Sequence, residues 1–518
     1  MCTCGTYQSV TKMAVSLLIL SILVTSVLSQ SCNIRETDEG SVCVCNAKYC
    51  DTVPDLDVST GKYQVYSTSK AKLGFYSTTG AFVENIEGEE SSINVDQDTK
   101  HQSIIGFGGA FTDSTGMNIK LLPEGAQKNL IESYFGSSGI AYSLCRVPIG
   151  GTDFSTRGYS YDDVEGDDTL EHFALQDDDF DFKIPFILQA KELRNNNIKL
   201  FASAWSAPTW MKTNNDWSGI GSLKEEYYQL WADYILRFYE EYDKNNISFW
   251  GMTTQNEPSD GLTLSTKINS MGWSSSQMNK WVGENLGPTI RNSAFSDLKI
   301  MLHDDSRNTL SNLSLLLENE KTMSYADGTA VHWYANIVVP ASSLDILNID
   351  KEDWFFISSE ACNGYLAIVG MDKSVRKGSW SRGKNYINDI LDNLEHGAGG
   401  WVDWNMVLNE KGGPTYIDNY VDSPVLINAT MQEFYKQPMF YSLGHFSKFA
   451  VPDSVRLETT VEELDNVRAM AFLRPDNLIA LIISNSGSEK TSVRIQNSQG
   501  QTAAIQIEAN SINTVLYS

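Results

Sequence analysis

Two glutamates stand at the points where apolar, strand-like runs of this chain break off. Glu257 follows "SFWGMTTQN" and precedes Pro258, and Glu360 closes the run "DWFFISSE". They are about 100 residues apart, roughly three βα units, so in a closed barrel they would face each other across its mouth. Facing carboxylates are what glycoside hydrolysis requires, because one protonates the leaving oxygen while the other attacks the anomeric carbon or activates water.

Eight apolar runs alternate with helix-length segments and would supply the strands that position these glutamates. Such alternation predicts βαβ units and a parallel sheet, and eight units predict a (β/α)8 TIM barrel. Between the runs, residues 224–244 show helical spacing of apolar side chains, and Pro258 predicts a strand end with Glu257 in an extended backbone. The runs are 101–111, 139–151, 198–210, 247–258, 298–306, 327–334, 353–361 and 397–406.

The other strand ends carry side chains suited to a sugar. Aromatic faces fit the C–H patches of a pyranose, and Asp, Asn and Arg fit its hydroxyls. The candidates are Arg146, Asp153, Phe154, Trp205, Trp210, His332, Trp333, Tyr334, Trp404 and Asn405.

Composition and leader pattern narrow the setting in which this chemistry would occur. Acidic residues outnumber basic ones by 65 to 39, which argues against nucleic acid as a partner. Lys12, the apolar run 14–24 and small residues up to Ser29 predict a cleaved signal peptide over 1–29. No later segment reaches the length of a transmembrane span, so we expect a soluble protein of the lysosome lumen or a secreted one.

Cysteines, sequons and metal motifs fit that compartment. Cys32, Cys43, Cys45 and Cys50 form an even cluster that predicts two disulfides, whereas zinc spacing is absent. Calcium is rejected at 177–188 and neither a G-x-S-x-G nor an H-E-x-x-H motif occurs, so we expect no metal and no cofactor. Cys145 and Cys362 are expected to be buried thiols. The N-glycosylation candidates of a glycoprotein are Asn246, Asn312 and Asn428.

Motifs along nearly the whole mature chain resemble the glucosylceramidases of glycoside hydrolase family 30. They occur in one order: "CVCNAKYC", "GFGGAFTD", "RVPIGGTDFS", "SAWSAPTWMKTN", "NEPSDGL", "AVHWY", "SSEAC", "GGWVDWNMVLNEKGGPTY", "DSPV" and "YKQPMFYSLGHFSKF". The resemblance implies a retaining β-glucosidase that hydrolyses glucosylceramide in sphingolipid catabolism. Departures such as "STKINSMGW" leave the aglycone preference open.

The resemblance also assigns roles to individual residues. Glu257 becomes the acid/base and Glu360 the nucleophile, and Arg146 and Tyr334 hold and polarise Glu360, with His332 as a further supporting residue. Disulfides Cys32–Cys43 and Cys45–Cys50 are implied. The implied substrate-binding residues are Asp153, Trp205, Asn256, Trp404 and Asn419.

The expected domain organisation places the barrel inside a β domain. We expect a signal peptide over 1–29, a disulfide-containing β segment over 30–57 that packs with about 406–437, and a catalytic barrel over 103–453. Short alternating strands predict an antiparallel β-sandwich formed by 58–102 and 454–518.

The remaining expectations concern the partners, the pH dependence and the alternative functions of the chain. The resemblance implies glucosylceramide in membranes as substrate, with an anionic lipid and a saposin-like activator as partners, while the oligomeric state stays open. We expect an activity optimum at roughly pH 4.5 to 6, because the acid/base must be protonated. The alternatives are a family 30 glycanase acting on a β-glucan or xylan and a non-catalytic sugar-binding barrel.

Overall fold

The computed structural model describes Met1 and residues 30–84, 91–263 and 267–518. The expected signal peptide lies outside the described residues, apart from Met1. Within the described part of the chain, no helix has both the length and the apolar character needed to cross a bilayer.

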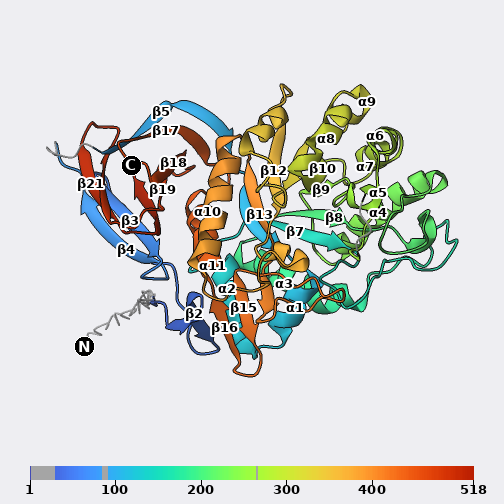
Figure 1. Cartoon of the computed structure of the whole chain (residues 1–518), viewed down its shortest axis with the longest axis horizontal. Helices are drawn as coiled ribbons and strands as arrows, with labels where there is room; N and C mark the ends of the chain where they lie inside the picture. Colours follow the sequence, from blue (N-terminus) through green and yellow to red (C-terminus); the bar gives the residue numbers. More distant parts are fainter. Residues whose placement is uncertain (2–29, 85–90, 264–266) are drawn as a thin grey trace.

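Eight parallel strands close into a barrel, so the predicted fold class is confirmed (Figure 1). Each of the eight apolar runs contributes one strand. Inside the barrel, side chains such as Leu144, Phe201 and Ile357 form one apolar cluster, so the interior is a packed core. The strands are β6 (Gly106–Ala110), β7 (Leu144–Ile149), β8 (Lys199–Ala204), β9 (Gly251–Thr253), β10 (Lys299–Ser306), β11 (Gly328–His332), β12 (Phe355–Glu360) and β13 (Gly400–Asn405).

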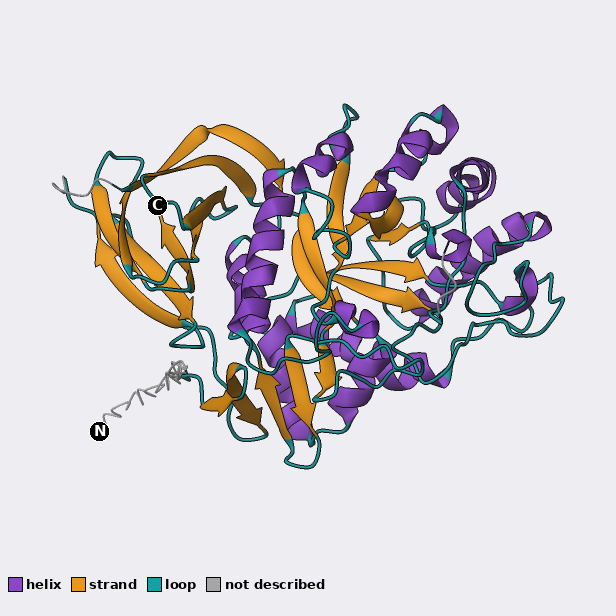
Figure 2. Cartoon of the chain, in the orientation of Figure 1, coloured by secondary structure: helices purple, strands orange, loops and turns teal. Residues whose placement is uncertain are grey.

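Helices surround this barrel (Figure 2). In α4, Trp231, Ile235, Phe238 and Tyr242 recur at helical spacing and are buried, which explains the helix predicted over 224–244. The α-helices are α1 (Asp113–Lys120), α2 (Glu124–Phe135), α3 (Ile184–Leu193), α4 (Tyr228–Lys244), α5 (Asp260–Thr263), α6 (Ser275–Trp281), α7 (Gly287–Arg291), α8 (Leu310–Leu317), α9 (Glu320–Met323), α10 (Trp380–Glu395) and α11 (Pro438–Phe449). Shorter helical turns are η1 (Asp179–Lys183), η2 (Thr209–Met211), η3 (Glu225–Tyr227), η4 (Val282–Leu286), η5 (Arg307–Thr309), η6 (Ala341–Leu347) and η7 (Tyr365–Val369).

A nine-stranded sheet beside the barrel combines strands from both ends of the chain. It curves around its own apolar core, to which Val65, Leu457, Ile505 and Val515 contribute (Figure 1). The strands are β3 (Lys62–Ser69), β4 (Tyr76–Ala81), β5 (Ser92–Ser103), β17 (Val455–Glu462), β18 (Val467–Leu473), β19 (Ile479–Asn485), β20 (Thr491–Gln496), β21 (Thr502–Ile507) and β22 (Ser511–Tyr517).

Helix α11 joins this sheet to the barrel. It contacts β6 of the barrel and β19 and β22 of the sheet. Its buried His445 forms hydrogen bonds to Thr514 Oγ1 at 2.8 Å and Thr68 Oγ1 at 3.1 Å. The two domains therefore share a fixed polar and apolar contact.

A third, small sheet contains the N-terminal cysteines. Disulfides join Cys32 to Cys43 and Cys45 to Cys50, the pairing that the resemblance implies. Cys145 and Cys362 are buried free thiols, as expected. The sheet runs in the order β1 (Ile34–Thr37), β2 (Gly40–Asn46), β16 (Glu433–Lys436), β15 (Val425–Asn428) and β14 (Val407–Asn409).

Candidate active site

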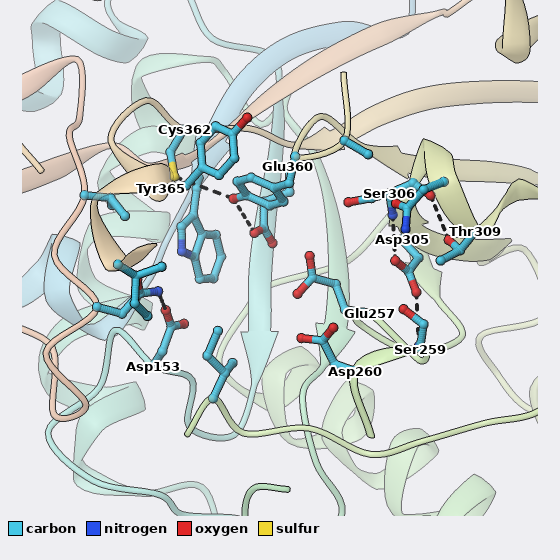
Figure 3. Close-up of a pocket in the computed structure, with 18 of the residues that line it drawn as sticks. Asp153, Glu257, Ser259, Asp260, Asp305, Ser306, Thr309, Glu360, Cys362 and Tyr365 are labelled. Atoms are coloured by element: carbon cyan, nitrogen blue, oxygen red, sulfur yellow. Dashed lines mark hydrogen bonds between the residues drawn. The ribbon is translucent and has the colours of Figure 1, made fainter. Parts of the chain in front are cut away.

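A pocket of about 690 Å³ opens at the carboxyl ends of the barrel strands, and both Glu257 and Glu360 line it (Figure 3). In a barrel of this kind, the loops at this end carry the active site. The two glutamates are therefore in the place where chemistry is expected.

Glu360 is the last residue of β12 and is held by two donors. The hydroxyl of Tyr334 donates to Oε1 at 2.7 Å, and Nη1 of Arg146 donates to Oε2. Arg146 itself lies on β7 and is fully buried. Both oxygens of Glu360 thus accept hydrogen bonds, which is the pattern of a carboxylate.

Glu257 lies beyond its strand and has a different environment. Its Oε1 is 3.0 Å from Nδ1 of His332, and its side chain is 17% exposed. Burial, followed by the negative charge of Asp260, raises the pKa of Glu257 to about 8, although His332 acts in the opposite direction. The geometry therefore favours a protonated Glu257 opposite a carboxylate at Glu360.

The backbone at Glu257 corrects the sequence prediction. Strand β9 ends at Thr253, and Glu257 has a φ of 40° in place of the extended backbone predicted from Pro258. The reason lies in tertiary hydrogen bonds. The N–H of Asn256 donates to the carbonyl of Ala204 at 3.0 Å, and the N–H of Glu257 donates to the carbonyl of Asp304 at 2.9 Å. Bonds to both neighbouring strands override the local preference of a residue before proline.

Asp304 links the environments of the two glutamates, and sequence reasoning missed it. It is fully buried near the end of β10 and accepts from Arg146 Nη2 at 2.6 Å, while its Oδ1 is 3.0 Å from His332 Nε2. Burial alone would raise the pKa of Asp304, but the charges of Arg146 and His332 hold it far below its usual value. The signal was available, because the fifth apolar run ends in two aspartates.

His332 is placed to carry a positive charge between carboxylates. Burial alone would lower its pKa, but the charges of Glu360 and Asp304 and the hydrogen bonds to Asp304 and Glu257 raise the pKa of His332 to about 10. An imidazolium donates from both nitrogens and has no lone pair for a metal. Although Glu257, His332 and Glu360 are close enough to surround an ion, this donor set does not fit one.

The spacing of the two carboxylates favours one stereochemical course. An oxygen of Glu257, an oxygen of Glu360 and a nitrogen of His332 all lie within 4.8 Å of one another. Carboxyl groups about 5 to 5.5 Å apart are typical of retaining glycosidases, whereas inverting enzymes need about 6.5 to 9.5 Å to admit a water molecule. The short separation of the closest carboxyl oxygens therefore favours the retaining course.

Polar and aromatic side chains line the same pocket as Glu360. Trp205 and Trp404 stack with ring centroids 5.0 Å apart. The amide of Asn419 donates to Asp153 Oδ2 at 2.8 Å, and burial raises the pKa of Asp153 to about 7 against that hydrogen bond. All four residues line the pocket, and Phe154 packs edge-on against Trp404.

Besides Arg146 and His332, four predicted residues lie outside the pocket lining. Asn256 is buried, and its Oδ1 accepts a hydrogen bond at 2.8 Å from Arg146, the residue that also holds Glu360. Asn405 accepts from Thr112 in the core. Trp210 donates to the carbonyl of Asp162, and Trp333 packs in the aromatic core. The prediction from strand ends therefore included two tryptophans, Trp210 and Trp333, that pack in the core and do not line the pocket.

Two family models match nearly all of the chain beyond residue 103. The glycosyl hydrolase family 30 TIM-barrel domain matches residues 104–450, and the family 30 beta sandwich domain matches residues 453–515. The chain belongs to glycoside hydrolase family 30. It is a glycosidase with a barrel and a β-sandwich.

Relatives in this family extend the likeness over most of the chain. Putative glucosylceramidase 3 of Caenorhabditis elegans is 40% identical over 92% of both chains. The lysosomal acid glucosylceramidase of Mus musculus is 37% identical over 88% of this chain and 89% of its own. A more distant relative, the endo-1,6-beta-D-glucanase BGN16.3 of Trichoderma harzianum, is 24% identical over 80% of this chain and 84% of its own.

A solved structure supports the same architecture. SrfJ from Salmonella typhimurium superposes with a TM-score of 0.81 at 25% identity, covering 88% of this chain and 99% of that chain. The family 30 arrangement of barrel and β-sandwich is thus shared by sequence and by shape.

The outer part of the pocket was largely missed from the sequence. Its residues belong to the end of β10 and to segments that follow β9, β10, β11, β12 and β14, whose positions depend on the closed barrel. One wall is polar and contains Asp260, Asp305, Ser306, Asn308, Thr309 and Asn312. The apolar part of the rim contains Ile268, Val338, Tyr365, Ile368 and Val421.

The three sequons have different settings in the structure. Asn246 and Asn312 are exposed, and Asn312 belongs to the polar wall of the pocket. Asn428 is half-buried, and its side-chain amide donates to Glu410 at 2.6 Å.

Proposed function

We propose that this chain is a retaining β-glucosidase that hydrolyses glucosylceramide to glucose and ceramide. The observation that carries the proposal is the close, unlike pair of carboxyl groups, Glu257 and Glu360, in the pocket of a family 30 barrel. Glucosylceramide is proposed because the relatives at 37% and 40% identity carry that name, whereas the glucanase relative is more distant.

In the first step, Glu360 attacks the anomeric carbon while Glu257 protonates the departing ceramide oxygen. The hydrogen bonds from Arg146 and Tyr334 aim the carboxylate of Glu360 and limit its rotation. The raised pKa of Glu257 keeps the acid form available at acidic and neutral pH. A covalent glucosyl-enzyme results.

In the second step, Glu257 accepts a proton from water, and the water attacks the anomeric carbon and releases glucose. After the first step Glu257 is negatively charged, and His332 is within hydrogen-bond distance to stabilise that charge. Because Asp304 fixes the other nitrogen of His332, the imidazolium keeps its orientation through both steps.

Glucose recognition is proposed for the polar and aromatic side chains that line the pocket with Glu360. Asp153 and Asn419 would bind hydroxyls, and Trp205 and Trp404 would flank the ring. Asn256 adjoins Arg146, and its side-chain amide would address the sugar 2-hydroxyl. These roles are supported by position in or beside the pocket.

The lipid part of the substrate would extend past the apolar rim, toward exposed apolar side chains that continue from Val338 and Ile368. Ile337, Val338, Ile368, Val369 and Met371 are between 64% and 75% exposed, and two of them line the pocket. Large exposed apolar side chains gathered at a pocket favour contact with a membrane or a lipid. We propose that this rim meets the bilayer, with an anionic lipid and a saposin-like activator as partners.

The lysosome lumen or a secreted compartment is the proposed location. A lysosomal relative and the signal-peptide pattern of the sequence support it. An acidic lumen would also protonate part of the excess of carboxylates that gives the chain its formal net charge of -26.

Glucose release from glucosylceramide vesicles, with and without anionic lipid and across pH, tests substrate, membrane dependence and compartment together. We expect release with an optimum at roughly pH 4.5 to 6 and stimulation by anionic lipid. Soluble β-1,6-glucan and xylan serve as competing substrates, and faster release from either would favour the glycanase alternative. Failure of a cyclitol epoxide to label the protein covalently would favour a non-catalytic barrel.

A further inference from the structure

A third carboxyl group stands beside the proposed acid/base. Asp260 begins the short helix α5, and its N–H donates to the carbonyl of Glu257 at 3.0 Å, which closes a turn between the two residues. Both side chains line the pocket, and Figure 3 shows their carboxyl groups next to each other on one side of it. Asp260 falls inside the motif "NEPSDGL", but the motif alone gave it no role.

We propose that Asp260 is a positioning residue that acts through Glu257: toward neutral pH, its negative charge holds the catalytic proton on Glu257 until the leaving group takes it. This inference rests on the proposed function, because it assigns a task within the same reaction. Both residues are partly buried and line the same pocket, where two adjacent carboxylates repel each other, so a charge on one favours retention of the proton on the other.

The surroundings of Glu257 explain why such a residue is needed. His332, which is positively charged and hydrogen-bonded to Glu257, favours loss of the proton. That contact lowers the pKa of Glu257, so burial and the neighbouring negative charges must outweigh it if the proton is to be kept. The groups facing Glu257 and Asp260 from the neighbouring strands are Arg146 on β7, Asp304 and Asp305 on β10, His332 on β11, Tyr334 after β11 and Glu360 on β12.

Among the anions of this set, Asp260 has the strongest effect on Glu257. Burial is the largest cause of the raised pKa of Glu257, the charge of Asp260 is the next, and the charge of Glu360 comes later. Asp304 is neutralised by Arg146 and His332, to which it is directly bonded. Glu360 is likewise paired with Arg146. Asp260 has no cationic partner among the ion pairs of the described residues, so its charge is less compensated.

Asp305 supports Asp260 but does not replace it. Its Oδ2 accepts from the N–H of Ser259 at 3.1 Å and its Oδ1 from its neighbour Ser306 at 2.7 Å, so it anchors the loop. Burial, followed by the charge of Asp305, raises the pKa of Asp260 to about 6. The proton is therefore shared within a coupled group, and removal of Asp260 changes the titration of the whole group.

The test compares the pH profile of kcat/KM for an aryl β-glucoside in the wild type, Asp260→Asn and Asp260→Glu. Asn keeps the size and hydrogen-bonding shape but removes the charge, so we expect the alkaline limb to move down by about one pH unit. Glu restores the charge, so its limb should return to within a few tenths of a unit of the wild type. Glu508→Gln is the matched control, because this exposed carboxylate pairs with Lys490 on the β-sandwich and should leave the limb unmoved.

A second measurement needs no turnover. The side-chain carboxyl ¹³C resonance of Glu257, assigned by its loss in Glu257→Gln, should titrate at a lower pH in Asp260→Asn than in the wild type. An unmoved limb or an unmoved titration in Asp260→Asn overturns the inference, and so does an Asp260→Glu profile that follows Asp260→Asn. A wild type without β-glucosidase activity would instead count against the proposed function, while the ¹³C titration would still decide the role of Asp260.

Discussion

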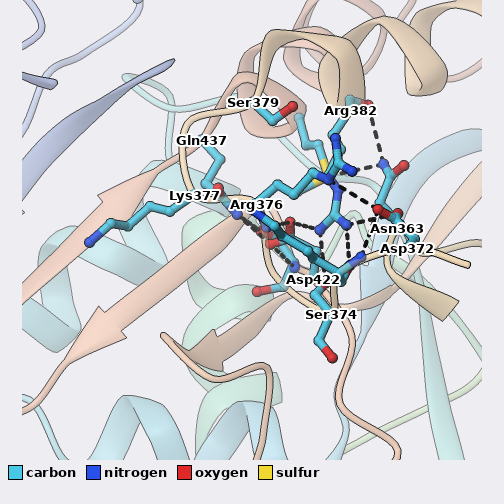
Figure 4. A network of polar contacts seen from close by, with 12 residues as sticks. Asn363, Asp372, Ser374, Arg376, Lys377, Ser379, Arg382, Asp422 and Gln437 are labelled. Atoms are coloured by element: carbon cyan, nitrogen blue, oxygen red, sulfur yellow. Dashed lines mark hydrogen bonds and ion pairs between the residues drawn. The ribbon is translucent and has the colours of Figure 1, made fainter. Parts of the chain in front are cut away.

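Two buried arginines, Arg146 and Arg382, each hold a pair of carboxylates, but they do so in different settings. Arg146 binds Asp304 and Glu360, and Arg382 binds Asp372 and Asp422. Around Arg382, the carbonyls of Lys373 and Ser374 also accept, so its guanidinium is enclosed by the loop after β12 (Figure 4). Around Arg146, one carboxylate faces the pocket.

The difference lies in what the second oxygen of each carboxylate contacts. Asp422 is fully buried, and its Oδ1 accepts from Gln437 at 2.7 Å and from the N–H of Ser423 at 3.0 Å. Glu360 has a single further donor, Tyr334, and remains accessible from the cavity. The same ion pair therefore anchors a loop where it is enclosed and becomes available for chemistry where one partner borders a cavity.

The largest expected effect separates these two carboxylates by activity. Glu360→Gln should lower kcat for an aryl β-glucoside by more than roughly 10⁴-fold, because an amide cannot form the glycosyl-enzyme. Asp422→Asn should leave kcat per folded molecule within about twofold, since Asp422 is not among the residues that line the pocket. Steady-state rates and circular dichroism of both variants check this. Turnover by Glu360→Gln at the wild-type rate would remove the nucleophile assignment.

At the enclosed site around Arg382, we expect substitutions to affect stability and not activity. Arg382→Ala leaves Asp422 buried without its cation, and we expect a loss of about 3 to 5 kcal/mol in the free energy of unfolding. Urea denaturation measures it, and activity at a temperature where the variant is folded should remain near that of the wild type. Arg382→Lys, which keeps the charge but loses the forked geometry, should lose less. Equal losses in both variants would mean that the forked hydrogen bonds, not the charge alone, are what Arg382 provides.

The sequence revealed the strands and the two glutamates of the pocket because both depend on local pattern. A buried parallel strand has a continuous apolar run, and a carboxylate at its end interrupts that run visibly, as at Glu257 and Glu360. Asp304 interrupts its run in the same way, so the reason it was missed is that its meaning depends on Arg146 and His332 from other strands.

The pocket walls and the backbone at Glu257 could not be predicted in this way. Trp205 and Trp210 both follow β8, but the turn after the strand places one in the pocket and the other in the core. The positive φ of Glu257 arises from hydrogen bonds to two neighbouring strands. Each of these features is decided by contacts between segments far apart in sequence, which no local pattern records.

A smaller effect concerns the pH dependence of stability on the pocket side. Because burial raises the pKa of Glu257 from 4.5 to about 8, the folded protein binds more protons than the unfolded chain between these values. The contribution of Glu257 to the free energy of unfolding is therefore greatest at low pH and is lost as the pH rises through this window. Glu257→Gln should flatten the decline between pH 5 and 8. Urea denaturation of the wild type and of Glu257→Gln at pH 5 and pH 8 checks it. If the free energy of unfolding declined with pH equally in both proteins, the raised pKa of Glu257 would be contradicted.

The smallest expected effect lies at the solvent-exposed edge of the Arg382 network, where Lys377 pairs with Glu410 at 2.6 Å. The side chains are 31% and 33% exposed, so water screens the pair. Lys377→Ala should change the free energy of unfolding by less than about 1 kcal/mol. The loss is small also because Glu410 keeps its hydrogen bond from Asn428. Differential scanning calorimetry of Lys377→Ala beside Arg382→Ala measures the contrast directly. A loss at Lys377 as large as at Arg382 would mean that exposure does not set the strength of these pairs, and the distinction between enclosed and open ion pairs would fail at its simplest point.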